Sequence, residues 1–428
     1  MARRLRMMGI PEGLVADDTE TNSRSLYICT YESKTGHAHY DIRAIRLSDL
    51  LSTFKSKSKI DLLRKLASVE GKDVPYLMGC GLLGSQILLA GGLEPRDPKQ
   101  KTGFRYGPYG SKQIYLFETD DDGKRKEKVV YNHGHSHSQS HTTSDEAEFG
   151  GIIKGDCCYG ELHQGKPEPL VVEVGGKLYV LSGGPRCFSK SPVFEEFNSG
   201  TWTTLPDPPF IGPRPRAFRY FSYAIVGTKI MVSTPITPAF CFDVAAPNPR
   251  QWWVCSAEPF PFLGLALVVD LEEEGSDLKC NKIMFGYERI PGYGHGYDVV
   301  AYAMFHDDEN GYCYYHRIQP LHLLTEFHAL LGRSHDTFRF VHLGGRKVCF
   351  VIASFIPGLE ADDDHPIPTT EKMNLVVVTF EYSISENNND GSTRSFSAKT
   401  LGSCVFPFDW ASESGRTFDG KLLGCFVR

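Results

Sequence analysis

Long apolar runs and an excess of basic residues are both missing from this sequence of 428 residues. No apolar stretch reaches the roughly 18 residues that a membrane-spanning helix needs, and no apolar segment of a signal peptide follows the arginines of the N-terminal MARRLRMMGIPEG. The formal net charge is -6, whereas a general nucleic-acid binder needs a basic surface for its phosphate contacts. We therefore expect no membrane partner, no secretion and no nucleic-acid partner, and we predict a cytoplasmic or nuclear protein.

The motifs that identify the common enzyme classes are missing as well. The sequence has no P-loop, no GxSxG nucleophile elbow, no HExxH zinc motif and no pair of CxxC motifs. Hydrolase and zinc-protease functions thereby lose their main support, and we expect no cofactor. Whether the protein is an enzyme is left undecided, with the absence of catalysis favoured.

The cysteines do not have the spacing of a disulfide framework. There are 12, which occur singly except for the adjacent Cys157 and Cys158. Several lie inside apolar, strand-like runs, where a free cysteine behaves as a small hydrophobic residue; these are Cys29, Cys349, Cys404 and Cys425. We predict buried, reduced thiols.

The most regular pattern lies between Pro169 and Phe210. Apolar and β-branched residues alternate with glycine and proline punctuation, which predicts four short antiparallel strands at 170–174, 177–181, 193–197 and 201–205. The Gly175-Gly176 pair fits a two-residue hairpin turn, because such turns often need φ > 0 and glycine reaches it without a Cβ clash.

Three features of this unit resemble a kelch repeat: the Gly183-Gly184 pair after a strand, Trp202 in the fourth strand, and the LPDPP segment that follows. The resemblance implies an all-β fold, a β-propeller of the kelch-repeat family with a galactose oxidase-like arrangement of blades. The sequence pattern resembles that of plant-type kelch-like proteins, but the leucine- and proline-containing helix of an F-box is missing. One such unit cannot bury both of its faces alone, so the pattern requires neighbours.

Further copies of the unit follow along the chain, with period-two alternation better preserved than the glycines. After 86–90, Gly91-Gly92 takes the place that Gly183-Gly184 holds. The predicted strands are 76–83, 86–90, 113–117 and 128–131 in one copy, 218–226, 229–233, 240–242 and 252–256 in the next, then 263–271, 282–287, 298–305 and 313–318, and finally 338–343, 347–353, 374–382 and 395–401.

Strands at both ends of the chain lack partners of their own. Strands at 26–30 and 38–47 precede the first copy, and FDGKLLGCFVR follows the last. If they share one sheet, the ring closes and leaves no exposed strand edge. We predict about six four-stranded blades, with seven as the alternative. Residues 1–24 would be a flexible tail and 25–428 the propeller, with a His/Ser-rich loop at 132–150.

Two connections have helical spacing of apolar residues. The first carries Ile60, Leu62, Leu63 and Leu66, and the second carries Leu321, Leu324, Phe327, Leu330 and Leu331. We predict a short helical insertion at each.

The His/Ser-rich loop is the first candidate metal site. There His133, His135, His137 and His141 alternate with small residues and would gather a divalent ion if a fold fixed the imidazoles. The surrounding polar residues favour a disordered loop.

The second candidate metal site is the acidic segment from Asp362 to His365. It has carboxylates for a hard cation but not the spacing of a calcium loop. Kelch propellers of glucosinolate breakdown carry an acidic-acidic-histidine iron motif. Glu360 and Asp364 match its separation, but Pro368 stands where the histidine belongs. We expect no bound metal.

Arginines and tyrosines near predicted strand ends form the candidate binding set. A propeller brings equivalent loops of successive blades around one mouth, where guanidinium and phenol groups suit a carboxylate, a phosphate or an acidic peptide. For any single residue, a bond to its own loop or to an adjacent blade is the favoured alternative. The candidates are Arg105, Tyr106, Arg186, Arg214, Arg216, Tyr287, Arg289 and Tyr297.

Acid-base chemistry has weak candidates in His295, His335 and Asp336. Histidine titrates near neutrality, and a carboxylate such as Asp298 beside His295 would orient it. Adjacent residues of a strand point to opposite faces, which counts against the pair at 335 and 336.

The leading hypothesis is a protein-interaction module that presents the loop-rich mouth of the propeller to a protein partner. Because propellers also host enzymes, the alternative is an enzyme that acts on a small plant metabolite by acid-base chemistry in the central pocket. A deep, dry pocket with a histidine beside a carboxylate would favour catalysis, and a broad charged mouth would favour binding.

Overall fold

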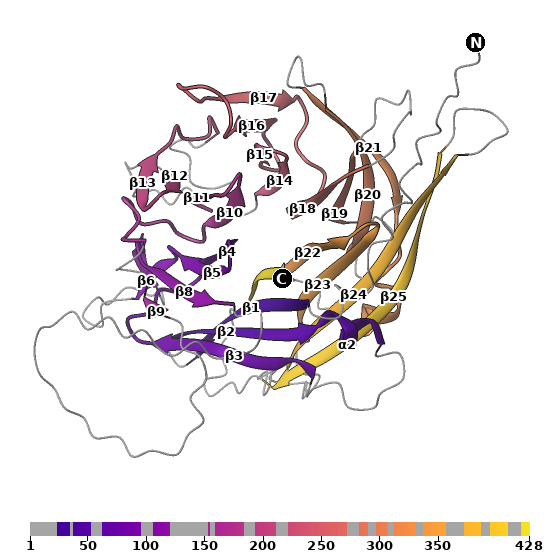
Figure 1. Ribbon diagram of the computed structural model, residues 1–428, viewed down its shortest axis with the longest axis horizontal. Coiled ribbons are helices and arrows are strands. Elements are labelled where there is room, and N and C mark those ends of the chain that lie inside the picture. The colour runs from indigo at the N-terminus through magenta and orange to yellow at the C-terminus, as the bar shows by residue number, and fades with distance from the viewer. Residues whose placement is uncertain are drawn as a thin grey trace, which may run out of the picture.

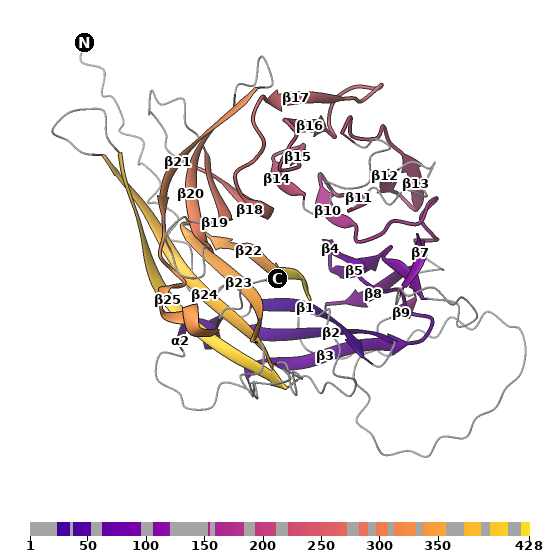
Figure 2. The same cartoon turned by 180° about the vertical axis from the view of Figure 1, so that it is seen from behind.

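The computed structural model describes residues 24–34, 37–52, 62–95, 106–119, 153–154, 159–183, 193–210, 221–271, 282–289, 297–306, 312–330, 337–356, 372–386, 394–409 and 421–428. These residues form mostly antiparallel β-sheets with little helix. The sheets stand side by side around a common centre, as views from opposite sides show (Figures 1 and 2). This radial arrangement is that of a β-propeller, so the predicted all-β class is confirmed.

The kelch-like stretch folds as one antiparallel sheet, and the four predicted strands match within one residue. The sheet consists of β10 (Leu170–Val174), β11 (Lys177–Leu181), β12 (Phe194–Asn198) and β13 (Thr201–Thr204). Val174 pairs with Lys177 across the Gly175-Gly176 turn, as expected for a two-residue hairpin.

The next sheets also follow the chain order. A parallel contact between Ser222 and Gly264 joins two antiparallel meanders, and a further meander follows. The strands are β14 (Ser222–Val226), β15 (Lys229–Ser233), β16 (Ala239–Asp243), β17 (Trp252–Ser256), β18 (Leu263–Asp270), β19 (Lys282–Arg289), β20 (Tyr297–His306), β21 (Cys313–Pro320), β22 (Thr337–Gly344), β23 (Lys347–Ile356), β24 (Lys372–Glu386) and β25 (Arg394–Asp409).

The two ends of the chain share one sheet, as predicted. Its order is β26 (Lys421–Val427), β1 (Ser25–Lys34), β2 (His37–Arg46) and β3 (Arg64–Gly71). The N–H of Ser25 donates to the carbonyl of Arg428 at 2.7 Å, and the N–H of Arg428 donates back at 3.1 Å. The last strand of the chain therefore lies on the edge of the first.

The predicted helix around Leu63 and Leu66 is wrong. A short helix α2 (Leu47–Ser52) comes earlier, and β3 runs through Leu66. Pairing with β2 satisfies the backbone of this segment and buries Ala67, so tertiary pairing overrides the local leucine spacing.

The sheet that follows β3 differs from its prediction in two places. It contains β4 (Gly79–Leu83), β5 (Gln86–Ala90), β8 (Ile114–Glu118) and β9 (Ile153–Lys154). The predicted fourth strand at 128–131 lies outside the described residues, and β9 takes its position beside β8. The connection between β5 and β8, for which no strand was predicted, contains the hairpin β6 (Leu93–Pro95) and β7 (Tyr106–Gly110).

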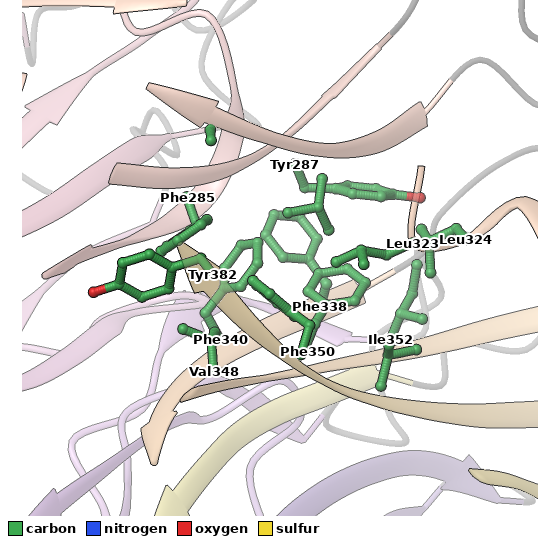
Figure 3. Close-up of a cluster of buried hydrophobic side chains, with 14 of the residues drawn as sticks. Phe285, Tyr287, Leu323, Leu324, Phe338, Phe340, Val348, Phe350, Ile352 and Tyr382 are labelled. Atoms are coloured by element: carbon green, nitrogen blue, oxygen red, sulfur yellow. The ribbon is translucent and has the colours of Figure 1, made fainter. Parts of the chain in front are cut away.

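The second predicted insertion is a 3₁₀ helix, η4 (Thr325–Leu330), rather than an α-helix. Its apolar face is as expected, because Leu324 and Phe327 are buried. They join the cluster of apolar side chains between the sheet of β18–β21 and the sheet of β22–β25, part of which is drawn in Figure 3.

Each sheet buries both faces against its neighbours. In β23, Val348, Phe350 and Ile352 pack towards one adjacent sheet, and the alternate residues Cys349, Val351 and Ala353 pack towards the other. Successive side chains of a strand point to opposite faces, so a strand between two sheets must be apolar on both.

The described cysteines are buried and free, as predicted: Cys29, Cys80, Cys241, Cys255, Cys313, Cys349, Cys404 and Cys425. Within the described part of the chain, no helix is long and apolar enough to cross a bilayer.

Candidate functional site at the propeller axis

A pocket of about 160 Å³ opens at the centre of the ring. The first residues of several innermost strands line it, so no single sheet forms it alone. Gly79 of β4, Leu170 of β10, Tyr223 of β14, Thr337 of β22 and Lys421 of β26 contribute to its wall.

Strand register identifies the face of the propeller on which this pocket lies. Gly79 pairs with Ala90 and Leu170 pairs with Leu181, so each innermost strand begins beside the end of the second strand. The connections between second and third strands, at 91–113 and 182–193, therefore attach at the pocket end of their sheets. Connections from one sheet to the next, such as the one leading to Ser222, attach at this end too.

The charged side chains of the pocket are Glu168, Arg339 and Lys421. Lys421 Nζ lies 3.1 Å from Glu168 Oε2, and about a third of each side chain is exposed. The guanidinium of Arg339 donates from Nε and Nη2 to the carbonyl of Leu423 at 2.9 and 2.6 Å, and from Nη1 to the carbonyl of Phe338 at 2.7 Å. Arg339 is thus fixed between β22 and β26.

Two non-glycine residues of the pocket wall have left-handed backbones. Leu77 has φ of 55° and Glu168 has φ of 44°, and each lies two residues before an innermost strand. Such conformations cost free energy for residues with a Cβ and persist only where the surroundings impose them.

The Gly183 backbone is one of the neighbours that hold Glu168. A Cβ on Gly183 would lie 1.9 Å from the Glu168 carbonyl oxygen, and the Gly183 N–H donates to the Pro167 carbonyl at 3.0 Å. The glycine that resembles the kelch doublet therefore allows the end of β11 to support the pocket wall.

A buried ion pair fixes the segment that leads into Glu168. The Lys166 ammonium donates to Glu195 of β12, and both side chains are fully buried. The same carboxylate accepts the backbone N–H groups of His163 at 2.9 Å and Gln164 at 3.1 Å. Burial lowers the pKa of Lys166 and the charge of Glu195 opposes this effect.

Of the predicted binding residues, Tyr287 and Tyr297 have described side chains. Their rings stack with centroids 5.4 Å apart, and Tyr287 is 3% exposed within the cluster of Figure 3. The backbones of Tyr106 and Arg289 belong to β7 and β19. Arg105, Arg186, Arg214 and Arg216 lie outside the described residues, and the binding role of the whole set stays a prediction.

The predicted catalytic and metal-binding residues also lie outside the described part of the chain: His295, His335 and Asp336, and His133, His135, His137 and His141. In the described part, no group of three or more histidine, cysteine or acidic side chains could hold a metal ion.

Asp298, which the sequence suggests as a partner for His295, lies next to a different histidine. The fully buried carboxylate accepts the N–H of Val299 at 2.7 Å, and its other oxygen lies 3.5 Å from Nδ1 of His322. His322 is half exposed and has φ of 53°. Sequence spacing missed this pair because its members belong to a strand start and to the connection after β21.

The pocket residues themselves were also missed. Glu168, Tyr223, Thr337, Arg339 and Lys421 have no shared motif, and what they have in common is a position at or near the beginning of an innermost strand. A polar residue next to the beginning of a predicted innermost strand is the sequence signal that could have identified them.

Comparison with protein families gives one match over part of the chain. The family described as "Protein of unknown function (DUF1668)" matches residues 157–275. This range includes the kelch-like stretch, Glu168 and Tyr223. A search of curated proteins finds no match.

Among solved structures, the chain is similar to one described as "Crystal Structure of the N-terminal Domain of Nup159". The TM-score is 0.29 and the sequence identity is 10%, over 88% of each chain.

Proposed function

We propose that this chain is a kelch-like β-propeller of six blades and that it acts as a protein-binding module. Six blades are supported by six apolar clusters in the described residues, each between two consecutive four-stranded units. The kelch assignment is supported by the doublets at Gly91 and Gly183, which both approach the backbone of the segment before β10. Membership of a plant-type group and a cytosolic or nuclear site of action remain predictions.

The observation that carries the binding function is the position of the axial pocket. It lies at the end of the sheets where long connections attach, and several sheets contribute to it. The segments that contain Arg186 and Arg214 join strands that end and begin on this face. A face with a central pocket and a rim of varied loops suits recognition of a protein surface.

Affinity purification of the tagged chain from its source tissue tests the proposal. The variant Glu168→Ala/Lys421→Ala changes the pocket rim, and Glu173→Ala changes an exposed residue at the opposite end of β10. We expect a protein that co-purifies with wild type and Glu173→Ala to be lost from the rim variant. Recovery of a tightly bound small molecule, with no protein lost from the rim variant, would contradict the binding function.

The alternative enzyme function has one observation in its favour, the Asp298–His322 pair. A buried carboxylate beside a half-exposed imidazole is an arrangement used in general acid-base catalysis. A retained metabolite that is converted by wild type and not by His322→Gln would support this alternative.

A further inference from the structure

The axial pocket has the capacity of one side chain. Its volume of about 160 Å³ is close to the roughly 150 Å³ of an engineered apolar cavity that holds benzene. Leu77, Met78, Leu170 and Leu422 supply apolar wall, so a bound group with a short carbon stem would find hydrophobic contacts. The pocket is therefore sized for a single anchoring group.

Hydrogen-bond donors outnumber acceptors among the polar side chains of the pocket. Arg339 and Lys421 are cationic donors, and the hydroxyl groups of Thr337 and Tyr223 can also donate. Glu168 is the anionic lining residue. The formal side-chain charge of the pocket is thus +1, from two cations and one anion, in a chain whose net charge is -6.

Arg339 is held in place with donor capacity remaining. A guanidinium has five N–H groups, and the bonds to the carbonyls of Leu423 and Phe338 account for three of them. Thr337 is held similarly, because its Oγ1 accepts the Leu422 N–H at 2.7 Å and its O–H proton stays available to an anion. Fixed donors of this kind favour binding because little side-chain freedom is lost.

The Lys421–Glu168 pair can exchange its carboxylate for that of a ligand. Each partner is about a third exposed, and an ion pair so accessible to water contributes little to stability. A ligand carboxylate entering between Lys421 and Arg339 would meet two cations.

We infer that the axial pocket binds a carboxylate on a short carbon stem, supplied by an acidic side chain of the bound protein. This inference rests on the proposed binding function. The same chemistry occurs in a free small carboxylic acid, so the experiment must separate the two sources.

The first arm uses propionate, which has the size and charge of a glutamate side chain, and propionamide as its neutral isostere. Amide chemical shifts of the full chain should change for Leu170, Thr337 and Leu422 with propionate and not with propionamide. Lys421→Met should weaken propionate binding about tenfold, because a charge-assisted hydrogen bond is lost. Glu168→Gln is the matched variant and should strengthen it, since the competing carboxylate is gone.

The second arm selects peptides from a random display library on the full chain. We expect Asp or Glu at one fixed position, with affinity reduced by Lys421→Met and raised by Glu168→Gln. Selected peptides whose binding depends on the pocket but not on a carboxylate would overturn the inference and leave the binding function standing. Propionate binding with no selectable peptide would overturn the protein-borne carboxylate and the binding function together. If Lys421→Met and Glu168→Gln changed the affinity for propionate equally, the assignment of the pocket as an anion site would be overturned.

Discussion

The backbone of Gly183 contacts the carbonyl oxygen of Glu168 so closely that a methyl group on Gly183 would lie 1.9 Å from it. One residue belongs to the glycine pair that resembles a kelch signature, and the other lines the axial pocket in a left-handed conformation. The kelch-like glycine pair and the candidate site are therefore one packing unit.

Gly183→Ala should destabilise the fold and displace the pocket rim. Overpacking of this kind costs about 1–3 kcal/mol, because the backbone has to move. Gly71→Ala is the control, since Gly71 does not have a left-handed backbone and the atom nearest to a Cβ there, Val74 Cγ2, lies at an ordinary contact distance of 3.4 Å. Urea unfolding measures both variants, and an alanine at 183 as stable as the control would contradict the assigned contact.

The Lys166–Glu195 pair should matter more for stability than an exposed pair. Glu195→Ala removes the acceptor of two backbone N–H groups and of a buried ammonium, and breaking a buried pair costs about 3–5 kcal/mol. Lys166→Met/Glu195→Gln retains an amide acceptor and removes the buried charge, so it should cost less than Glu195→Ala. A double variant that is less stable than Glu195→Ala would show that the ammonium is not the source of the cost.

Acid should destabilise the sheet of β26, β1, β2 and β3 by protonating Asp41 of β2. The carboxylate contacts Lys65 Nζ at 2.7 Å, Arg43 Nη2 at 2.8 Å and His39 Nε2 at 2.9 Å. Burial alone would raise the pKa of Asp41, but these hydrogen bonds and charges outweigh it and hold the pKa well below its usual range.

Because the folded pKa is the lower one, the unfolded chain binds more protons in acid, and stability falls as pH drops below about 5. Asp41→Asn should flatten this dependence between pH 7 and pH 3.5, measured as the urea midpoint. Asp73→Asn, at an exposed position, is the control. Parallel pH profiles for wild type and Asp41→Asn would contradict the assigned charge interactions.

A second carboxylate should behave in the same way at the boundary between two sheets. Glu196 accepts from Arg250 at 2.5 Å and from Tyr179 at 2.8 Å. Burial raises the pKa of Glu196, while bonds from Arg250, Tyr179 and Lys177 lower it further than burial raises it. Glu196→Gln should therefore lose stability at pH 7 and lose less additional stability on acidification than wild type. Unchanged stability at pH 7 would contradict the role of the Arg250 contact.

The sequence predicts those elements that local residues determine, and it does not predict those that depend on contacts between distant segments. The strands at 170–174 and 177–181 were predictable because a glycine turn and period-two apolar residues fix the hairpin locally. The strand β3 was not, because Leu62, Leu63 and Leu66 mimic a helix and pairing with β2 decides the outcome. The pocket was not predictable either, since Glu168, Arg339 and Lys421 meet only when the ring closes.

Closure by the last strand gives the most direct test of the architecture. Residues 421–428 cover the edge of β1 and place Leu422 and Cys425 in one apolar cluster and Leu423 in the next. Deletion of these residues should abolish cooperative unfolding, because it exposes a strand edge and opens two clusters. Arg428→Ala, which removes the 2.8 Å bond to Thr119 Oγ1, should cost only about 1 kcal/mol.

Adding the peptide KLLGCFVR to the truncated chain should restore the cooperative transition, because it supplies the same edge and the same apolar residues. A truncated chain that unfolds cooperatively without the peptide would show that β26 is not needed to close the ring.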